Sequence, residues 1–327
     1  MLFGGARIRS RPGIRAPGGL PGVATVGTVA GGAGCSHDQE GIESLSIGEI
    51  VREIEVAGAP YGVTVGPDGA LWFTLVTQGA IGRYAEGQVE TFALDPVGGQ
   101  PTVIVAGDDN ALWFTEFHGG RLGRITLDGA VSSLTMDGPY GVCAGPGGMW
   151  FTELQAGRVG RIAGDGGIEG VAVDGMPSMI TAGSDGAVWF TVNQGNAIGR
   201  IDTDLTVTLH PLPTPSAAPV GIAAGPDGAV WFTEIGVGAI GRIDSTGTVT
   251  ECALPDRDSR PHAIVTGPDG ALWFTEWASG NLGRIDTDGK IDHLTLPGAE
   301  PHGLTVDSTG HLWVAMESGA LVEVSPG

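Results

Sequence analysis

Short apolar runs rich in β-branched residues, separated by turns of Gly, Asp and Pro, follow one another along most of this chain. One order recurs: a run such as "GVTVG", a "PDG" turn, the run "ALWFT", the run "AIGRI", a "TDG" turn, and a last run such as "VTECAL". Asp favours the start of such turns, and Gly accepts positive φ within them. No window of useful length shows the 3.6-residue period of an amphipathic helix. The pattern therefore predicts four short antiparallel strands in each copy of this unit.

The unit occurs seven times, which is clearest at its tryptophan. The seven tryptophans are Trp72, Trp113, Trp150, Trp189, Trp231, Trp273 and Trp313. Their spacings are 41, 37, 39, 42, 42 and 40 residues, and only Trp277 lies outside the series. A period of this size with β-type segments is typical of the blades of a β-propeller.

The two ends of the repeat region complement each other. After Trp313 the chain ends with "GALVEVSPG", which leaves the seventh unit without a fourth strand, whereas "EIVREIEV" at 49–56 resembles the fourth strands of the other units. We therefore expect an all-β fold over residues 46–327: a seven-bladed β-propeller of four-stranded antiparallel blades, closed by the N-terminal strand pairing into the last blade. Residues 1–45 lie outside the ring. We expect a disordered leader or a mis-assigned start there rather than a weak export signal, because Pro21 and several glycines interrupt its apolar part.

Composition narrows the choice of partners. The 327 residues carry 16 basic and 37 acidic side chains, a net charge of -21, which disfavours nucleic acid and anionic membranes as partners. No apolar run reaches the roughly 18 residues that a membrane span needs. Cys35, Cys143 and Cys252 are too few and too scattered for a disulfide framework or a zinc motif. We expect a cytoplasmic monomer.

Comparison of the repeats separates the scaffold from a candidate site. Residues that recur in most units belong to the scaffold, and we expect the tryptophans to pack between blades. Six arginines of "GR" motifs also recur, namely Arg83, Arg124, Arg161, Arg200, Arg242 and Arg284. Four glutamates stand three residues after the key tryptophan, namely Glu116, Glu153, Glu234 and Glu276. We expect the arginines to have structural roles, with these glutamates as their partners.

The seventh unit breaks the pattern at positions that should face one mouth of the central channel. A Pro-X pair opens each inner strand, and X reads Tyr61, Thr102, Tyr140, Ser178, Val220, His262 and His302. The residue before Pro reads Ala59, Gln100, Gly138, Met176, Ala218, Arg260 and Glu300. Four residues after the key tryptophan stand Val76, Phe117, Leu154, Asn193, Ile235, Trp277 and Glu317. We therefore expect Glu300, His302 and Glu317 to lie together, with His262 one blade away.

This combination of side chains has a known chemical use. Two glutamates can bind a hard divalent cation such as Mg²⁺, which polarises a carbonyl group, and a neighbouring histidine can remove a proton. The competing interpretation is a set of solvated polar residues at a loop rim. His118, His210, His293 and His311 show no such convergence, and we expect them to be surface residues.

At these residues the chain resembles the virginiamycin B lyase, or streptogramin B lyase, family of seven-bladed propellers. The most specific matches are "RPHAI" at 260–264, "LWFTEW" at 272–277, "EPHG" at 300–303 and "AME" at 315–317. The resemblance implies an Mg²⁺-dependent carbon–oxygen lyase that linearises cyclic streptogramin B depsipeptides by elimination at the ester bond and so confers antibiotic resistance. It implies His302 as the general base, and Glu300 and Glu317 as Mg²⁺ ligands. His262 would contact the substrate and Tyr61 would line the pocket.

Two other functions stay open at this point. One is a propeller that binds a ligand at its mouth without catalysis, and the other is a metal-dependent lactonase- or esterase-like propeller. The chain also departs from its own pattern. Val314 replaces the phenylalanine of the other blades, and Leu75 and Val76 replace residues that are more polar in the family.

Overall fold

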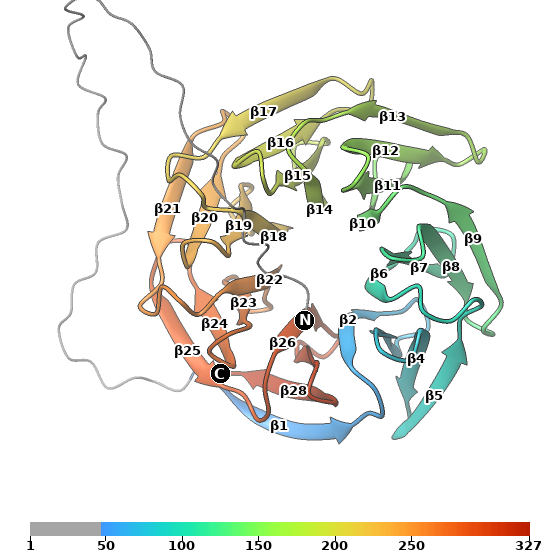
Figure 1. The fold of residues 1–327 in the computed structure, drawn as a ribbon. Helices are drawn as coiled ribbons and strands as arrows, with labels where there is room; N and C mark the ends of the chain where they lie inside the picture. The colour runs from blue at the N-terminus through green and yellow to red at the C-terminus, as the bar shows by residue number, and fades with distance from the viewer. Residues whose placement is uncertain (1–46) are drawn as a thin grey trace, which may run out of the picture. The chain divides into compact units, whose positions relative to one another are not determined.

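The computed structural model describes residues 47–327, so the predicted leader at 1–45 lies outside the described residues. These residues form seven four-stranded sheets arranged as a ring around a central channel (Figure 1). The predicted fold class, a seven-bladed β-propeller, is confirmed. Within the described range, no helix is long and apolar enough to cross a bilayer.

Each blade contributes one strand to each of four concentric shells. The innermost strands are β2 (Pro60–Val65), β6 (Pro101–Ala106), β10 (Pro139–Gly145), β14 (Pro177–Ala182), β18 (Pro219–Ala224), β22 (Pro261–Thr266) and β26 (Pro301–Val306). The second strands are β3 (Leu71–Leu75), β7 (Ala111–Glu116), β11 (Gly148–Glu153), β15 (Val188–Val192), β19 (Val230–Glu234), β23 (Leu272–Glu276) and β27 (Leu312–Met316). The third strands are β4 (Ala80–Ala85), β8 (Arg121–Thr126), β12 (Arg158–Ala163), β16 (Ala197–Ile201), β20 (Ala239–Ile243), β24 (Asn281–Ile285) and β28 (Ala320–Pro326). The outer strands are β5 (Gln88–Ala93), β9 (Val131–Thr135), β13 (Ile168–Ala172), β17 (Val207–Pro211), β21 (Val249–Ala253), β25 (Ile291–Thr295) and β1 (Gly48–Glu55).

The ring closes as predicted. Strand β1 pairs antiparallel with β28, from Gly48 opposite Pro326 to Glu55 opposite Ala320. Blade seven therefore has the strand order β1-β28-β27-β26 and contains both ends of the repeat region (Figure 1). Closure of this kind pairs the edges that an open array would leave exposed.

The hydrophobic core consists of seven clusters, each at a contact between neighbouring blades. Trp72 of blade one, for example, packs with Ile104, Leu112 and Phe114 of blade two, and Trp313 of blade seven packs with Phe73 of blade one. The other five clusters repeat this arrangement. The expectation that the tryptophans pack between blades is confirmed, so each blade depends on its neighbour for burial.

The irregular Val314 has a compensating partner. In the other six blades a phenylalanine of the second strand lies against a glycine of the third, and a Cβ on Gly82 would stand 2.1 Å from the Phe73 ring. In blade seven Val314 pairs with Val322, which occupies the glycine position. Both valines are fully buried. The missing ring volume is thus supplied from the opposite strand, and the blade keeps a filled core.

The recurring arginines have structural roles, but their partners differ from our expectation. Trp72 Nε1 donates to Asp68 Oδ1 at 3.0 Å, and Arg83 Nε donates to Asp68 Oδ2 at 2.8 Å. The same Asp–Trp–Arg arrangement occurs at Asp109, Asp185, Asp227 and Asp269. Three of the four glutamates that follow the tryptophan by three residues have other partners, as in the ion pair of Glu116 with Arg121 at 2.7 Å. The strand register places these two residues opposite each other, whereas the "GR" arginine lies opposite the tryptophan.

Candidate active site

The backbone of the channel mouth is positioned by threonines of the second strands. Thr275 Oγ1 of blade six donates to the His302 carbonyl at 2.8 Å, and Thr233 Oγ1 of blade five donates to the His262 carbonyl at 2.8 Å. The equivalent residue of blade seven is Ala315, which has no hydroxyl group to offer the Tyr61 carbonyl. Each histidine is thus held by the blade before it as well as by its own strand.

A backbone hydrogen bond joins the two predicted metal ligands. Glu317 N donates to Glu300 O at 3.0 Å, and Trp277 N donates to Arg260 O in the same way at 3.1 Å. Glu300 has a left-handed backbone with φ of 57°, and Arg260 shares this conformation with φ of 54°. Glu300 therefore shares its backbone conformation and hydrogen bond with Arg260 of blade six. Blade seven differs from blade six at this position in the side chain.

The side chains at the mouth form a compact group around His302. His302 Nε2 lies 2.7 Å from Glu317 Oε2, and the Tyr61 ring stacks on the imidazole with centroids 4.1 Å apart. The His262 ring meets His302 edge-on at 5.0 Å, and the Tyr61 hydroxyl lies 3.3 Å from His262 Nε2. Four of the five predicted site residues thus come together at the junction of blades six, seven and one.

The electrostatics give His262, Tyr61 and Glu317 definite protonation states. Burial and the nearby His302 lower the pKa of His262 to about 3, so its imidazole is neutral at physiological pH. Burial, followed by the neighbouring Tyr140, raises the pKa of Tyr61 well above its usual value, so its phenol is protonated. The hydrogen bond from His302 lowers the pKa of Glu317, whose carboxylate is therefore ionised. The ionised Glu317 carboxylate thus lies in one group with the neutral side chains of His262 and Tyr61.

Glu300 differs from the other predicted residues. Its side chain is exposed, although its backbone is bonded to that of Glu317. Within residues 47–327, the one cluster of three metal-ligating side chains within 4.8 Å is Asp307, His311 and Glu323, outside this site. The structure therefore brings the backbones of Glu300 and Glu317 together, while the Glu317 carboxylate engages His302.

Two of the histidines assigned to the surface have carboxylate partners: His293 is exposed, as expected, and His311 is half-buried. His293 Nδ1 lies 3.2 Å from the buried carboxylate of Glu276, and His311 Nδ1 lies 2.6 Å from the buried carboxylate of Glu323. Repeat spacing could not reveal these pairs, because each histidine stands on a different strand or turn from its glutamate.

Trp277 belongs to the mouth, although the sequence did not single it out as a site residue. Its ring lies 6.3 Å from His302, and the Arg260 guanidinium lies over it at 5.5 Å. The Nε1 atom is buried without a hydrogen-bond partner in the described chain. The signal was present in the sequence, because Trp277 occupies the same repeat position as Glu317.

The residues at the mouth fit a hard divalent cation. The main chains of Glu300 and Glu317 are bonded to each other, and the Glu300 side chain is exposed to solvent. Glu317 uses Oε2 for His302, and no hydrogen bond from the described chain engages its Oε1. Mg²⁺ is commonly bound by one or two carboxylates and keeps several waters, which this partly open arrangement allows.

Known proteins with this architecture share its sequence pattern. A virginiamycin B lyase of Nocardia farcinica is 57% identical over 174 residues, which cover 53% of this chain and 62% of that protein. The matched segment thus spans less than two thirds of that relative. A solved streptogramin B lyase superposes with a TM-score of 0.81 at 36% identity, covering 84% of this chain and 97% of that one.

A second enzyme has been solved in more than one form. The virginiamycin B lyase of Staphylococcus aureus superposes with a TM-score of 0.80 at 37% identity, covering 84% of this chain and 98% of that one. A catalytically inactive histidine-to-alanine variant of that enzyme has been solved with quinupristin. The model of the virginiamycin B lyase family matches residues 49–324, which is the whole ring. This chain therefore belongs to the virginiamycin B lyase family.

Proposed function

We propose that the protein is an Mg²⁺-dependent carbon–oxygen lyase that linearises cyclic streptogramin B-type depsipeptides by elimination at the ester bond. The observation that carries the proposal is the hydrogen bond between His302 Nε2 and Glu317 Oε2 at 2.7 Å, beneath the stacked ring of Tyr61. Unlike the His293–Glu276 and His311–Glu323 pairs, this pair lies at the channel mouth, where the imidazole also meets His262 and Tyr61. The family to which the chain belongs, and the quinupristin found with its Staphylococcus aureus member, support the substrate class.

His302 is the general base. At 2.7 Å from an ionised carboxylate, Nε2 carries the proton of the neutral imidazole, because two facing lone pairs would repel each other. The lone pair then resides on Nδ1, which is buried and has no hydrogen-bond partner in the described chain. The Glu317 carboxylate also stabilises the imidazolium that forms when Nδ1 takes a proton.

His262 and Tyr61 bind and orient the substrate. We assign the Tyr61 hydroxyl as the donor to His262 Nε2, 3.3 Å away, which places the proton of the neutral His262 on Nδ1. His262 Nδ1 is buried and unpartnered in the described chain, so it is available as a donor to a substrate carbonyl. A donor aimed at the carbonyl beside the reacting carbon stabilises the charge that develops during proton removal.

Glu300 and Glu317 are the residues that would hold Mg²⁺. When bound, the ion would supply a Lewis acid that polarises a substrate carbonyl oxygen. Glu300 suits this role because its carboxylate is exposed at the rim and free of the scaffold's ion pairs.

The reaction balances without added water. His302 takes the proton on the carbon α to a carbonyl, and those electrons form a double bond to the β carbon. The bond between the β carbon and the ester oxygen breaks, and the carboxylate departs with the electron pair. The ring opens to a linear product of unchanged mass. Such a product has lost the cyclic shape of the antibiotic, so the activity would confer resistance.

Mass spectrometry of quinupristin incubated with the protein and Mg²⁺ tests the proposal. We expect a linear product with the mass of the substrate, whereas an esterase would add the mass of one water. H302A should abolish turnover. H293N is the matched control, because His293 also pairs with a glutamate but stands on the outer strand β25.

The Mg²⁺ requirement needs a separate measurement. Chelation should abolish turnover and added Mg²⁺ should restore it, with E300Q requiring a higher Mg²⁺ concentration than the wild type. Turnover that survives H302A, or a product that has gained water, contradicts the elimination mechanism.

A further inference from the structure

Blade seven also breaks the repeat pattern at the end of its strands away from the mouth. In five blades the aspartate four residues before the tryptophan forms an ion pair with an arginine of the third strand. In blade seven Thr309 takes that aspartate position, and the aspartate appears two residues earlier as Asp307. Glu323 replaces the arginine opposite Trp313, and His311 stands two residues before the tryptophan.

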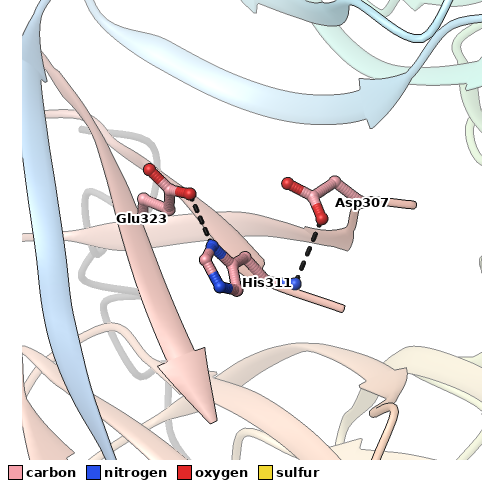
Figure 2. Close-up of side chains that lie close together, drawn as sticks. All are labelled: Asp307, His311 and Glu323. Carbon is pink, nitrogen blue, oxygen red and sulfur yellow. Dashed lines mark hydrogen bonds and ion pairs between the residues drawn. The ribbon is translucent and has the colours of Figure 1, made fainter. Parts of the chain in front are cut away.

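These changes converge on one small volume. Figure 2 shows Asp307 and His311 from the turn between β26 and β27 facing Glu323 of β28. His311 Nδ1 lies 2.6 Å from Glu323 Oε1, and one ligand atom from each of the three residues falls within 4.8 Å of the others. The Glu323 side chain is buried, with a relative exposure of 4% for the residue.

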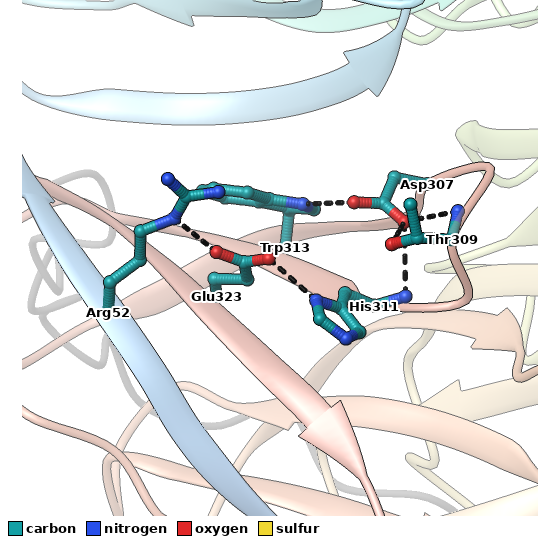
Figure 3. A network of polar contacts seen from close by, with 6 residues as sticks. All are labelled: Arg52, Asp307, Thr309, His311, Trp313 and Glu323. Atoms are coloured by element: carbon teal, nitrogen blue, oxygen red, sulfur yellow. Dashed lines mark hydrogen bonds and ion pairs between the residues drawn. The ribbon is translucent and has the colours of Figure 1, made fainter. Parts of the chain in front are cut away.

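An outer set of contacts orients the two carboxylates (Figure 3). Arg52 of the closing strand β1 bonds to Glu323 Oε2 and lies over the Trp313 ring at 5.3 Å. Trp313 Nε1 donates to Asp307 Oδ2 at 2.8 Å, and the Thr309 amide donates to Asp307 Oδ1 at 2.8 Å. Carboxylates that are held in this way by arginine, indole and amide donors resemble the outer-shell support of bound metals.

The charges in this volume do not balance. In the five regular blades each aspartate faces one arginine, so the pair is neutral. In blade seven two carboxylates, Asp307 and Glu323, lie near the single guanidinium of Arg52. A bound cation would offset the excess of negative charge beside the buried glutamate.

We propose that Asp307, His311 and Glu323 bind one transition-metal dication of the Zn²⁺ class. Nδ1 of His311, Oε1 of Glu323 and a carboxylate oxygen of Asp307 are its ligands. An imidazole in the set favours Zn²⁺, Co²⁺ or Ni²⁺ over Mg²⁺ and Ca²⁺, which prefer oxygen ligands.

The site is separate from the mouth and serves the closure of the ring. Strand β26 begins at the mouth with Pro301 and ends at Val306, just before the turn that holds Asp307. An ion there ties this turn to β28, and Arg52 extends the connection to β1. The role is structural, and it does not depend on the lyase activity proposed above.

Zn²⁺ titration of the metal-stripped full-length chain by calorimetry tests the proposal, with Co²⁺ absorbance as a second readout. We expect one Zn²⁺ per chain at this site, a rise in Tm on binding, and a visible Co²⁺ spectrum typical of histidine ligation. H311N keeps an amide donor toward Glu323 and should lower Zn²⁺ affinity at least about tenfold, with loss of the Tm rise. D307N should weaken binding as well.

Two controls separate this site from others. H293N should bind Zn²⁺ as the wild type does, because His293 has a glutamate but no second carboxylate in a metal-binding cluster. E300Q should also leave this site intact. Binding lost in E300Q but kept in H311N would place the ion at the mouth and overturn the proposal. Wild-type protein without a histidine-type Co²⁺ spectrum overturns it even if H311N fails to fold.

Discussion

Glu234 of blade five offers a quantitative test of the scaffold. The residue is fully buried, and neither carboxylate oxygen has a hydrogen-bond partner in the described chain. Blades two and three place an arginine opposite their equivalent glutamate, as Arg121 stands opposite Glu116, but the residue opposite Glu234 is Ala239. Burial, followed by the nearby Glu251, raises the pKa of Glu234 to about 8. The side chain is therefore protonated at neutral pH.

The raised pKa has a direct consequence for stability. In the unfolded chain Glu234 ionises near its usual pKa of 4.5, whereas in the folded chain it keeps its proton until about pH 8. The contribution of Glu234 to the free energy of unfolding is fully present below pH 4.5. It is lost as the pH rises from 4.5 toward 8, at about 1.4 kcal/mol per pH unit. The loss by pH 7 is then about 3 kcal/mol. Glutamine has the shape of the protonated acid and does not titrate, so E234Q removes this loss.

Urea unfolding at pH 4.5, 6 and 7.5 measures the effect. We expect E234Q to match the wild type at pH 4.5 and to be more stable by about 4 kcal/mol at pH 7.5. E116Q is the matched control with the opposite sign, because it breaks the buried pair with Arg121 and should cost about 3 kcal/mol at pH 7.5. An E234Q difference that is independent of pH, or a loss of stability at pH 7.5, would refute the reasoning.

Two further predictions concern the mouth and the core. T275V removes the hydroxyl that holds the His302 carbonyl and should lower kcat about tenfold or more, because small displacements of a catalytic group are costly. T152V removes the equivalent bond in blade three, so steady-state kinetics should show unchanged turnover, and equal losses in both variants would contradict the assignment. V314F should destabilise blade seven by about 1–3 kcal/mol, and V322G should rescue it in thermal unfolding. Additive losses in a double-mutant cycle would contradict the compensation between these valines.

The fold was predictable because its signals are local and repeated. A period of about 40 residues identified the blades, and the missing last strand at 49–56 identified the closure, which the pairing of β1 with β28 confirms. The partners of the "GR" arginines were not predictable from spacing. They depend on the register of the second and third strands, which sets the arginine opposite the tryptophan and beside the turn aspartate.

The sequence predicted which strand ends carry the candidate site, but it did not predict the contacts between the side chains. Repeat positions correctly placed Tyr61, His262, His302 and Glu317 at one mouth, because a propeller brings equivalent strand ends together. They could not show that Glu317 engages His302. Packing does not determine the direction of the exposed Glu300 side chain, so its proposed role as an Mg²⁺ ligand rests on chemistry rather than on contacts.

The position of the odd residues in the last repeat has a structural reason. In the regular blades a threonine holds the mouth residue of the next blade, as Thr275 holds His302, but Ala315 leaves the Tyr61 carbonyl without this bond. Tyr61 is positioned instead by stacking on His302 and by the bond between its hydroxyl and His262. Among the seven junctions between blades, the junction of the last and first blades is therefore the one without the threonine hydrogen bond. Side chains of the site position the mouth residue there instead. Tyr61 therefore lacks a threonine link, whereas the backbones of His262 and His302 keep theirs, as do the mouth residues at the other four junctions.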